Sequence, residues 1–145
     1  MTFHSTCKTC NRTAIVNVNG NCYYCDTEKC SYQSEKMSVR IFQEIFSEFE
    51  FRKCRPKFLQ GLELDTYCPE LKLGVEYNGI QHYQFNEYFQ KTEYNFIKQQ
   101  EQDDRKNRLC HENGIKLCVI PYTYSFQNPD ELEKFIKDWV KENFD

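Results

Sequence analysis

Long apolar segments are missing from this sequence of 145 residues. No run of about 18 uncharged apolar residues occurs, so we expect no membrane-spanning helix. The first residues, Met1-Thr2-Phe3-His4, lack a basic stretch followed by an apolar one; we therefore expect no secretory signal and an intracellular protein. Disorder is a poor fit, because 16% of the residues are aromatic. The sequence predicts one ordinary domain, or one domain with a small appendage.

An excess of positive charge is also missing. The formal net charge is -3, which argues against a strongly basic nucleic-acid-binding coat. The acidic excess lies in residues 129–145, whereas four basic residues cluster near the middle of the chain: Arg52, Lys53, Arg55 and Lys57. Such a cluster is often only a solvated loop, but next to a sheet it can neutralise DNA phosphates.

Large aliphatic side chains are scarce in residues 1–33, so this segment cannot fold on a hydrophobic core alone. It contains two CxxC pairs, Cys7/Cys10 and Cys22/Cys25, and Asn19-Gly20 offers a tight turn before the second pair. Two such pairs complete a tetrahedral Zn²⁺ site. Because a closed four-cysteine site has no open position for a substrate, the zinc would be structural and would drive folding.

The pattern of these four cysteines resembles a zinc ribbon, and we interpret residues 1–35 as this domain and residues 36–145 as a second one. Nine cysteines without a secretory signal favour metal ligation plus free thiols over disulfides. Two alternatives stay open: Cys30 could replace another ligand, and a CxxC pair could be redox-active. The redox alternative needs a strand-to-helix junction, which the ribbon with its Asn19-Gly20 turn is not expected to provide. The remaining cysteines are expected to be small buried apolar residues: Cys54, Cys68, Cys110 and Cys118.

Hydrophobic periodicity predicts an α/β fold, a small mixed sheet flanked by helices, for the rest of the chain. The basic cluster is expected in a loop after the first helix. The predicted elements are a helix over 38–50 with Ser38 as N-cap, strands over 62–67 and 71–77, a helix from Thr92 to about Asn113 that Gly114 ends, a strand over 116–120, and a helix that Asn128 caps and Pro129 starts.

Two acidic residues are expected to face each other on the predicted hairpin. A four-residue turn at 69–72 sets Asp65 opposite Glu76, although like charges directly opposed on a sheet are destabilising. A divalent cation such as Mg²⁺, which prefers carboxylate oxygens, would explain the pair. The alternative is an ordinary solvated face.

Three neighbouring features favour a site at this place. Gln81 and His82 follow directly after the hairpin, and Asp103 is expected on the inward face of the long helix. Lys106, one turn beyond Asp103, can neutralise it. Taken alone, His82 could equally be a loop histidine that the backbone satisfies.

The segment from Glu63 to Tyr83, with Asp103-x-x-Lys106 and the stretch from Gly114 to Tyr122, resembles the restriction-endonuclease-like (PD-(D/E)XK) superfamily. Within it, the sequence is most similar to very short patch repair endonucleases and EDxHD homing endonucleases. Uncharacterised proteins of large DNA viruses and phages, some with an N-terminal zinc ribbon, are similar too. The resemblance implies a restriction-endonuclease-like fold and a metal-dependent nuclease.

The resemblance also implies roles for individual residues. Asp65 would be the principal Mg²⁺ ligand and Glu76 a second one. His82 would be the general base or would orient water, and Asp103 would be an acidic residue of the site on the long helix. Gln81 would position water or contact phosphate. His suits its role because its ordinary pKa of about 6.5 lets it accept a proton near neutrality.

Two features depart from the family pattern. The superfamily's E-x-K motif would place a lysine at position 78, where this chain has Asn78, so Gln81, His82 or Lys106 would have to replace that lysine. The branch also uses a glutamate from the first helix, for which Glu44 is the candidate.

We therefore hold two hypotheses for the function. The first is a Mg²⁺-dependent endonuclease that nicks or cuts DNA, with the zinc ribbon aiding docking to nucleic acid or a partner, and with DNA contacts from Arg52, Lys53, Arg55, Lys57 and Lys106. The second is a catalytically inactive, zinc-containing module that binds nucleic acid or protein, in viral transcription or packaging. A homodimer or a viral protein partner is compatible with either. The expected location is the cytoplasm or nucleus of a host cell, or the virion.

Overall fold

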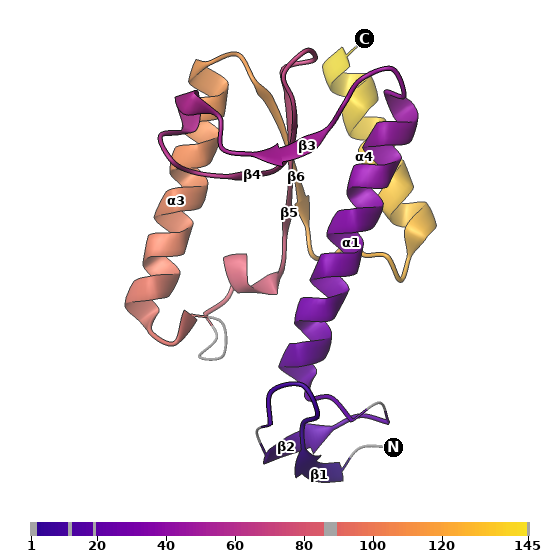
Figure 1. Ribbon diagram of the computed structural model, residues 1–145, viewed down its shortest axis with the longest axis vertical. Coiled ribbons are helices and arrows are strands. Elements are labelled where there is room, and N and C mark those ends of the chain that lie inside the picture. Colours follow the sequence, from indigo (N-terminus) through magenta and orange to yellow (C-terminus); the bar gives the residue numbers. More distant parts are fainter. Residues whose placement is uncertain (1–2, 12, 19, 86–89, 145) are drawn as a thin grey trace.

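The computed structural model describes residues 3–11, 13–18, 20–85 and 90–144 (Figure 1). Asn19 of the predicted tight turn lies outside the described residues. The elements are β1 (Phe3–Thr6), β2 (Thr13–Val16), α1 (Tyr23–Ile45), β3 (Arg52–Cys54), η1 (Lys57–Leu59), β4 (Leu64–Cys68), β5 (Leu73–Asn78), η2 (Ile80–His82), α3 (Glu93–Glu112), β6 (Lys116–Pro121) and α4 (Pro129–Phe144).

A mixed sheet lies at the centre of the larger part of the molecule. Its strand order is β3-β4-β5-β6; β4 pairs antiparallel with both β3 and β5, and β6 pairs parallel with β5. Helix α3 covers one face, and α1 and α4 cover the other (Figure 1). The predicted α/β class and mixed sheet flanked by helices are thus confirmed.

The two faces of β5 carry different side chains. Leu73, Val75 and Tyr77 pack into the core beneath α1 and α4, whereas Glu76 points toward α3, where it contacts Lys106. This alternation follows from the two-residue period of a strand. It puts a buried carboxylate on the face that α3 covers.

The first helix begins fifteen residues earlier than predicted and ends at Ile45 rather than near residue 50. Cys22 occupies its N-cap position, and Ser38 is buried inside the helix, where its hydroxyl donates to the carbonyl oxygen of Ser34 at 2.8 Å. The boundary expected between residues 35 and 36 therefore falls within α1. The N-terminal half of α1 carries few large aliphatic residues, because this half extends away from the main core to the cysteines. Hydrophobic periodicity therefore does not indicate the true start of the helix.

The basic cluster is only partly a loop, because Arg52 and Lys53 lie on the edge strand β3, whereas Arg55 lies in the loop that follows and Lys57 begins η1. Arg52 pairs with Tyr67 and Cys54 with Leu64 across to β4. Buried Phe51 anchors the strand in the core. A strand of three residues is too short for alternation to be recognised in the sequence.

Other local predictions are confirmed. The Thr92 side chain accepts a hydrogen bond from the backbone N–H of Asn95 at 3.1 Å and caps α3. Gly114, which follows this helix, has a φ of 71°. The hairpin turn closes where Lys72 N–H donates to the Pro69 carbonyl oxygen at 3.2 Å.

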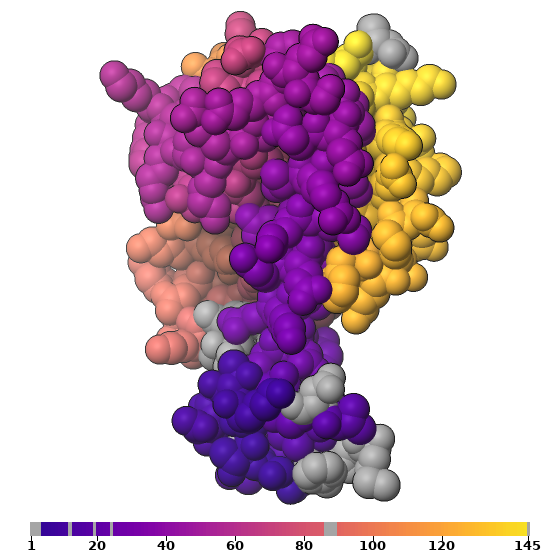
Figure 2. All heavy atoms as spheres, turned by 45° about the vertical axis from the view of Figure 1, so that its right-hand side comes forward, coloured from indigo at the N-terminus to yellow at the C-terminus, as the bar shows by residue number. Residues whose placement is uncertain are grey.

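The N-terminal strands and the start of α1 form a small body that projects from one end of the sheet domain (Figure 2). β1 and β2 pair antiparallel, with Phe3 opposite Val16, and α1 runs from this body along the larger part of the molecule (Figure 1). We call residues 3–25, within the described ranges, the Cys module. In the described part of the chain, no helix is both long and apolar enough to cross a membrane.

Candidate functional site

The four predicted zinc ligands gather in the Cys module. The sulfur atoms of Cys7, Cys10, Cys22 and Cys25 all lie within 4.8 Å of one another. The close contacts cross between the pairs: Cys7 Sγ is 3.8 Å from Cys25 Sγ, and Cys10 Sγ is 3.9 Å from Cys22 Sγ. Four converging thiols suit a tetrahedral metal ion such as Zn²⁺. A cluster able to bind a metal is therefore present, as predicted.

Different elements supply the two pairs. Cys7 and Cys10 follow β1, whereas Cys22 caps α1 and Cys25 lies in its first turn. A helix start thus replaces the second turn of a simple ribbon. Contrary to the expectation for the Asn19-Gly20 ribbon, Cys22 and Cys25 therefore lie at the kind of junction that a redox pair needs. The crossed contacts favour metal binding instead.

The surroundings of Cys7 favour the thiolate form that a metal requires. Its pKa is lowered to about 6, chiefly because the backbone amides of Cys10 and Cys22 donate to the sulfur. The Cys22 amide nitrogen lies 3.3 Å from Cys7 Sγ. Metal ligation needs deprotonated cysteines, so these amides assist binding. Away from the cluster, Cys68, Cys110 and Cys118 are fully buried, as predicted. Cys54 is half-buried.

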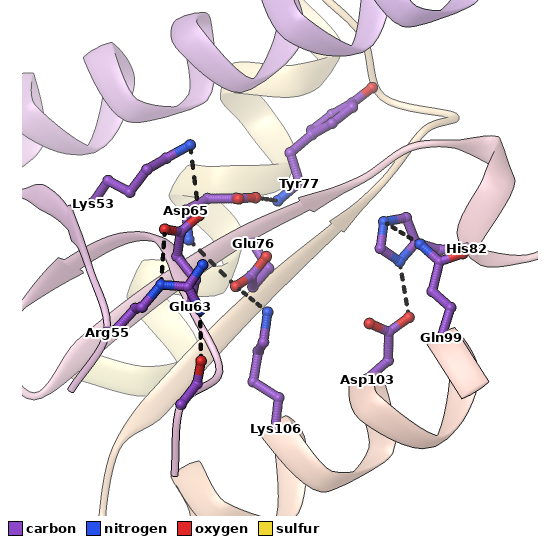
Figure 3. Close-up of polar contacts among 11 residues, drawn as sticks. Lys53, Arg55, Glu63, Asp65, Glu76, Tyr77, His82, Gln99, Asp103 and Lys106 are labelled. Carbon is purple, nitrogen blue, oxygen red and sulfur yellow. Dashed lines mark hydrogen bonds and ion pairs between the residues drawn. The ribbon is translucent and has the colours of Figure 1, made fainter. Parts of the chain in front are cut away.

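A second candidate site lies where β4 and β5 separate. Their register pairs Thr66 with Val75, so one step further Asp65 faces Glu76. The carboxylates bind the backbone amides there: Tyr77 N–H donates to Asp65 Oδ2 at 3.0 Å, and Asp65 N–H to Glu76 Oε1 at 3.3 Å (Figure 3). The structure thus brings the predicted carboxylate pair together.

Glu76 is buried and carries the most perturbed carboxyl group of this site. Burial and the negative charge of Asp65 raise its pKa to about 8, while Lys106 opposes the rise. Lys106 Nζ donates to Glu76 Oε1 at 2.8 Å. The expected neutralisation of Asp103 by Lys106 is wrong, because the lysine side chain extends from α3 toward β5 (Figure 3).

Asp103 instead binds His82. His82 Nδ1 lies 2.8 Å from Asp103 Oδ2, and His82 Nε2 lies 3.4 Å from Gln99 Nε2 (Figure 3). Helix α3 therefore supplies one partner to the histidine on η2 and another to Glu76 on β5. Next to the histidine, the side-chain oxygen of Gln81 is buried and has no hydrogen-bond partner among the described residues.

These side chains share a cleft of about 600 Å³ between α1 and α3. Glu35 and Glu28 of α1 also line it, and both were missed. Glu35 is half-buried, and burial together with the charge of Asp65 raises its pKa. Glu44, the expected glutamate of the first helix, is exposed and does not line the cleft. Glu28 and Glu35 are seven residues apart and share one helix face, a signal that an earlier helix start would have revealed.

The cleft is predominantly acidic. Its charged residues are Glu28, Glu35, Glu63, Asp65, Glu76 and Asp103 against Arg55 and Lys106, with His82 between them. Within the described ranges, the four cysteines are the one group of three or more potential ligands whose ligand atoms lie close enough together to hold a metal ion. The carboxylate oxygens of the cleft lie farther apart than such a group requires.

The predicted basic cluster contributes little to the cleft. Arg55 lines it, whereas Arg52, Lys53 and Lys57 do not. Arg55 and Lys53 both lie near Glu63, at 3.6 and 3.9 Å, and Arg52 lies 3.8 Å from Glu50. These pairs are exposed, so they are weak and leave the cations able to exchange partners.

The chain is similar to three uncharacterised viral proteins. It is 43% identical over 94 residues to protein 033L of Invertebrate iridescent virus 3, 45% over 84 residues to protein 307L of Invertebrate iridescent virus 6, and 43% over 65 residues to protein 094L of Frog virus 3. These matches cover 61%, 50% and 44% of this chain, and 48%, 43% and 42% of the viral proteins. The chain thus matches less than half the length of these relatives. No protein-family model matches the chain, and no solved structure does so significantly.

Proposed function

We propose that the protein is a Mg²⁺-dependent endonuclease of restriction-endonuclease-like fold that hydrolyses DNA phosphodiester bonds in the acidic cleft. The observation that carries this proposal is the opposed pair of Asp65 and Glu76 in one cleft with the His82–Asp103 pair. The carboxylates of Asp65 and Glu76 lie opposite each other and repel, and a divalent cation between them relieves that repulsion.

In this proposal Asp65 and Glu76 hold the cation, and Glu35 adds a third carboxylate from α1. Magnesium, when bound, orients the scissile phosphate and stabilises the charge that develops on it. The acidic excess of the cleft supports such a role, because without a cation these carboxylates would repel a phosphate.

His82 is the proposed general base. Asp103 holds Nδ1, so Nε2 is the nitrogen that accepts a proton from an attacking water molecule. Gln99 Nε2 lies 3.4 Å from His82 Nε2 in this structure, and the water would take its place. As the water oxygen bonds to phosphorus, the bond to the leaving oxygen breaks, and that oxygen takes a proton from solvent. Lys106 is placed to replace the lysine absent at position 78, because it already reaches Glu76.

Nicking of supercoiled plasmid by zinc-loaded protein tests the proposal. We expect nicking with Mg²⁺ or Mn²⁺, none with EDTA, and a loss of at least about a hundredfold in Asp65→Ala and His82→Ala. Glu35→Ala and Glu44→Ala form a matched pair on α1, since only Glu35 lines the cleft. Activity that survives in Asp65→Ala would contradict the assignment.

The second candidate is an inactive zinc-containing binding module. Asn78 in place of lysine and the Glu76–Lys106 ion pair within the carboxylate group favour it. In that case Asp65→Ala would leave DNA binding unchanged, while Cys7→Ser would abolish binding. Absence of cleavage on plasmid, single-stranded and branched DNA, with binding retained, would select this candidate.

A further inference from the structure

A second cavity, of about 640 Å³, lies beside the acidic cleft, between the Cys module and the sheet domain. Aromatic and aliphatic side chains form much of its wall, including Tyr23, Tyr77, Tyr122, Ile15 and Ile80. We call it the tyrosine cavity. Its volume is in the range typical of ligand-binding pockets.

The tyrosine cavity adjoins the cleft. Ser31 and Tyr77 line both of them. Gly79 lies at this boundary with a φ of -68°, a conformation that any residue adopts. A Cβ there would lie 2.5 Å from Gln81 Oε1 and 2.7 Å from Ser31 Oγ. The glycine therefore serves close approach rather than backbone freedom.

The charge of the tyrosine cavity differs from that of the cleft. Among the described residues that line the tyrosine cavity, Asp26 is the one charged side chain, and none is cationic. The side-chain amide of Asn17 donates a hydrogen bond to the Asp26 carboxylate. A phosphate would find no positive partner here. A flat, neutral ring with a hydrogen-bonding edge suits tyrosine rings combined with the amide groups of Asn21 and Gln127.

We propose that the tyrosine cavity binds one unstacked nucleobase of the DNA strand whose phosphate occupies the cleft. This inference rests on the proposed function, and it names the form of the substrate. Removing a base from a duplex breaks its pairing and stacking, and it costs least where that base is already unpaired. The protein then prefers DNA with an unpaired nucleotide beside the scissile phosphate over fully paired DNA.

Binding of three matched DNA duplexes tests the inference. One duplex is fully paired, one carries a single extrahelical thymidine, and one carries an abasic nucleotide in its place. Fluorescence anisotropy is measured with His82→Ala protein in Mg²⁺, so that binding is observed without cleavage. We expect the thymidine duplex to bind about tenfold more tightly than the abasic one, the size that stacking of one base on an aromatic side chain supplies.

Two exposed tyrosines provide the variant and its control. Tyr23→Ala removes part of the tyrosine cavity wall and should abolish the difference between thymidine and abasic DNA; Tyr94→Ala, on α3 and lining neither cavity, should retain it. Thr27→Phe, which fills the cavity from α1, should act like Tyr23→Ala. Circular dichroism and zinc content check that each variant is folded.

The outcomes separate this inference from the proposed function. Equal affinity for thymidine and abasic DNA, or no DNA binding at all, overturns the inference whatever the plasmid experiment shows. A base preference that Tyr23→Ala removes, in a protein that never nicks DNA, supports the tyrosine cavity and rejects the nuclease.

Discussion

The hydroxyl of Ser34 connects two distant parts of the chain. It accepts a hydrogen bond from the backbone N–H of Phe126 at 3.0 Å, and the serine is fully buried. Ser34→Ala leaves that amide without its partner, so we expect a loss of about 1 to 2 kcal/mol in the free energy of unfolding. Ser38→Ala is the control, since its hydroxyl only supplements a helical carbonyl and its loss should cost less. Urea denaturation measures both; equal losses would contradict the assignment.

Glu76 makes stability depend on pH. Its pKa in the folded protein is about 8, against an ordinary value of 4.5, so the folded state binds the proton more tightly than the unfolded chain. This contribution is complete below about pH 4.5 and is lost as pH rises through about 8. In zinc-loaded protein without magnesium, we expect Glu76→Gln to be more stable than the wild type by roughly 1 to 3 kcal/mol at pH 8, and equally stable near pH 4.

Urea denaturation across this pH range measures the effect of Glu76. Glu44→Gln is the control, because Glu44 is exposed on α1 and its substitution should leave the pH profile as in the wild type. A Glu76→Gln profile as steep as that of the wild type would show that another group is responsible.

At the scale of elements, the β4–β5 hairpin contains a strained residue. Lys72 in its turn has a φ of 52°, which costs a residue with a side chain more than it costs glycine. We expect Lys72→Gly to stabilise the protein by about 0.5 to 1 kcal/mol, since its carbonyl keeps the hydrogen bond from the Lys116 amide. Glu70→Gly, where φ is not positive, should destabilise it. Thermal denaturation distinguishes the two, and a destabilised Lys72→Gly would contradict this account.

Elements with local signals could be predicted from the sequence. Alternation and a Pro-containing turn placed Asp65 opposite Glu76, and Thr92 marked the start of α3. The start of α1 could not be predicted, because its cap is Cys22, a cluster residue, and its first turns lack core aliphatics. Glu35 was missed for that reason. The partner of Lys106 depended on which way a long side chain extends, which sequence spacing does not determine.

At the scale of the whole molecule, the Cys module and the sheet domain depend on different interactions. The core of the Cys module consists of the cysteines with Val16 and Ala14, whereas the sheet domain has cores on both faces of its sheet. We expect a zinc chelator to unfold the module and shorten α1 at its N-terminus, while the sheet domain stays folded.

Circular dichroism and NMR measure this separation on titration with the chelator. Cys22→Ser should reproduce the effect without chelator. Cys118 is buried but does not belong to the cluster, so Cys118→Ser should leave the zinc content unchanged. Cooperative loss of the whole fold on chelation would contradict independent folding.

Helix α1 runs without interruption from the cysteine cluster past the cleft. The number of residues between the two sites therefore fixes how the Cys module is rotated about the helix axis relative to the cleft. One residue inserted between Cys25 and Glu35 would turn the Cys module by about 100° around the helix axis, and the tyrosine cavity would lose one wall. Seven inserted residues would restore the phase to within about 20° while moving the module by roughly 10 Å. Homologues that keep the same arrangement of cysteines and cleft are therefore expected to conserve the length of this segment even where its residues differ.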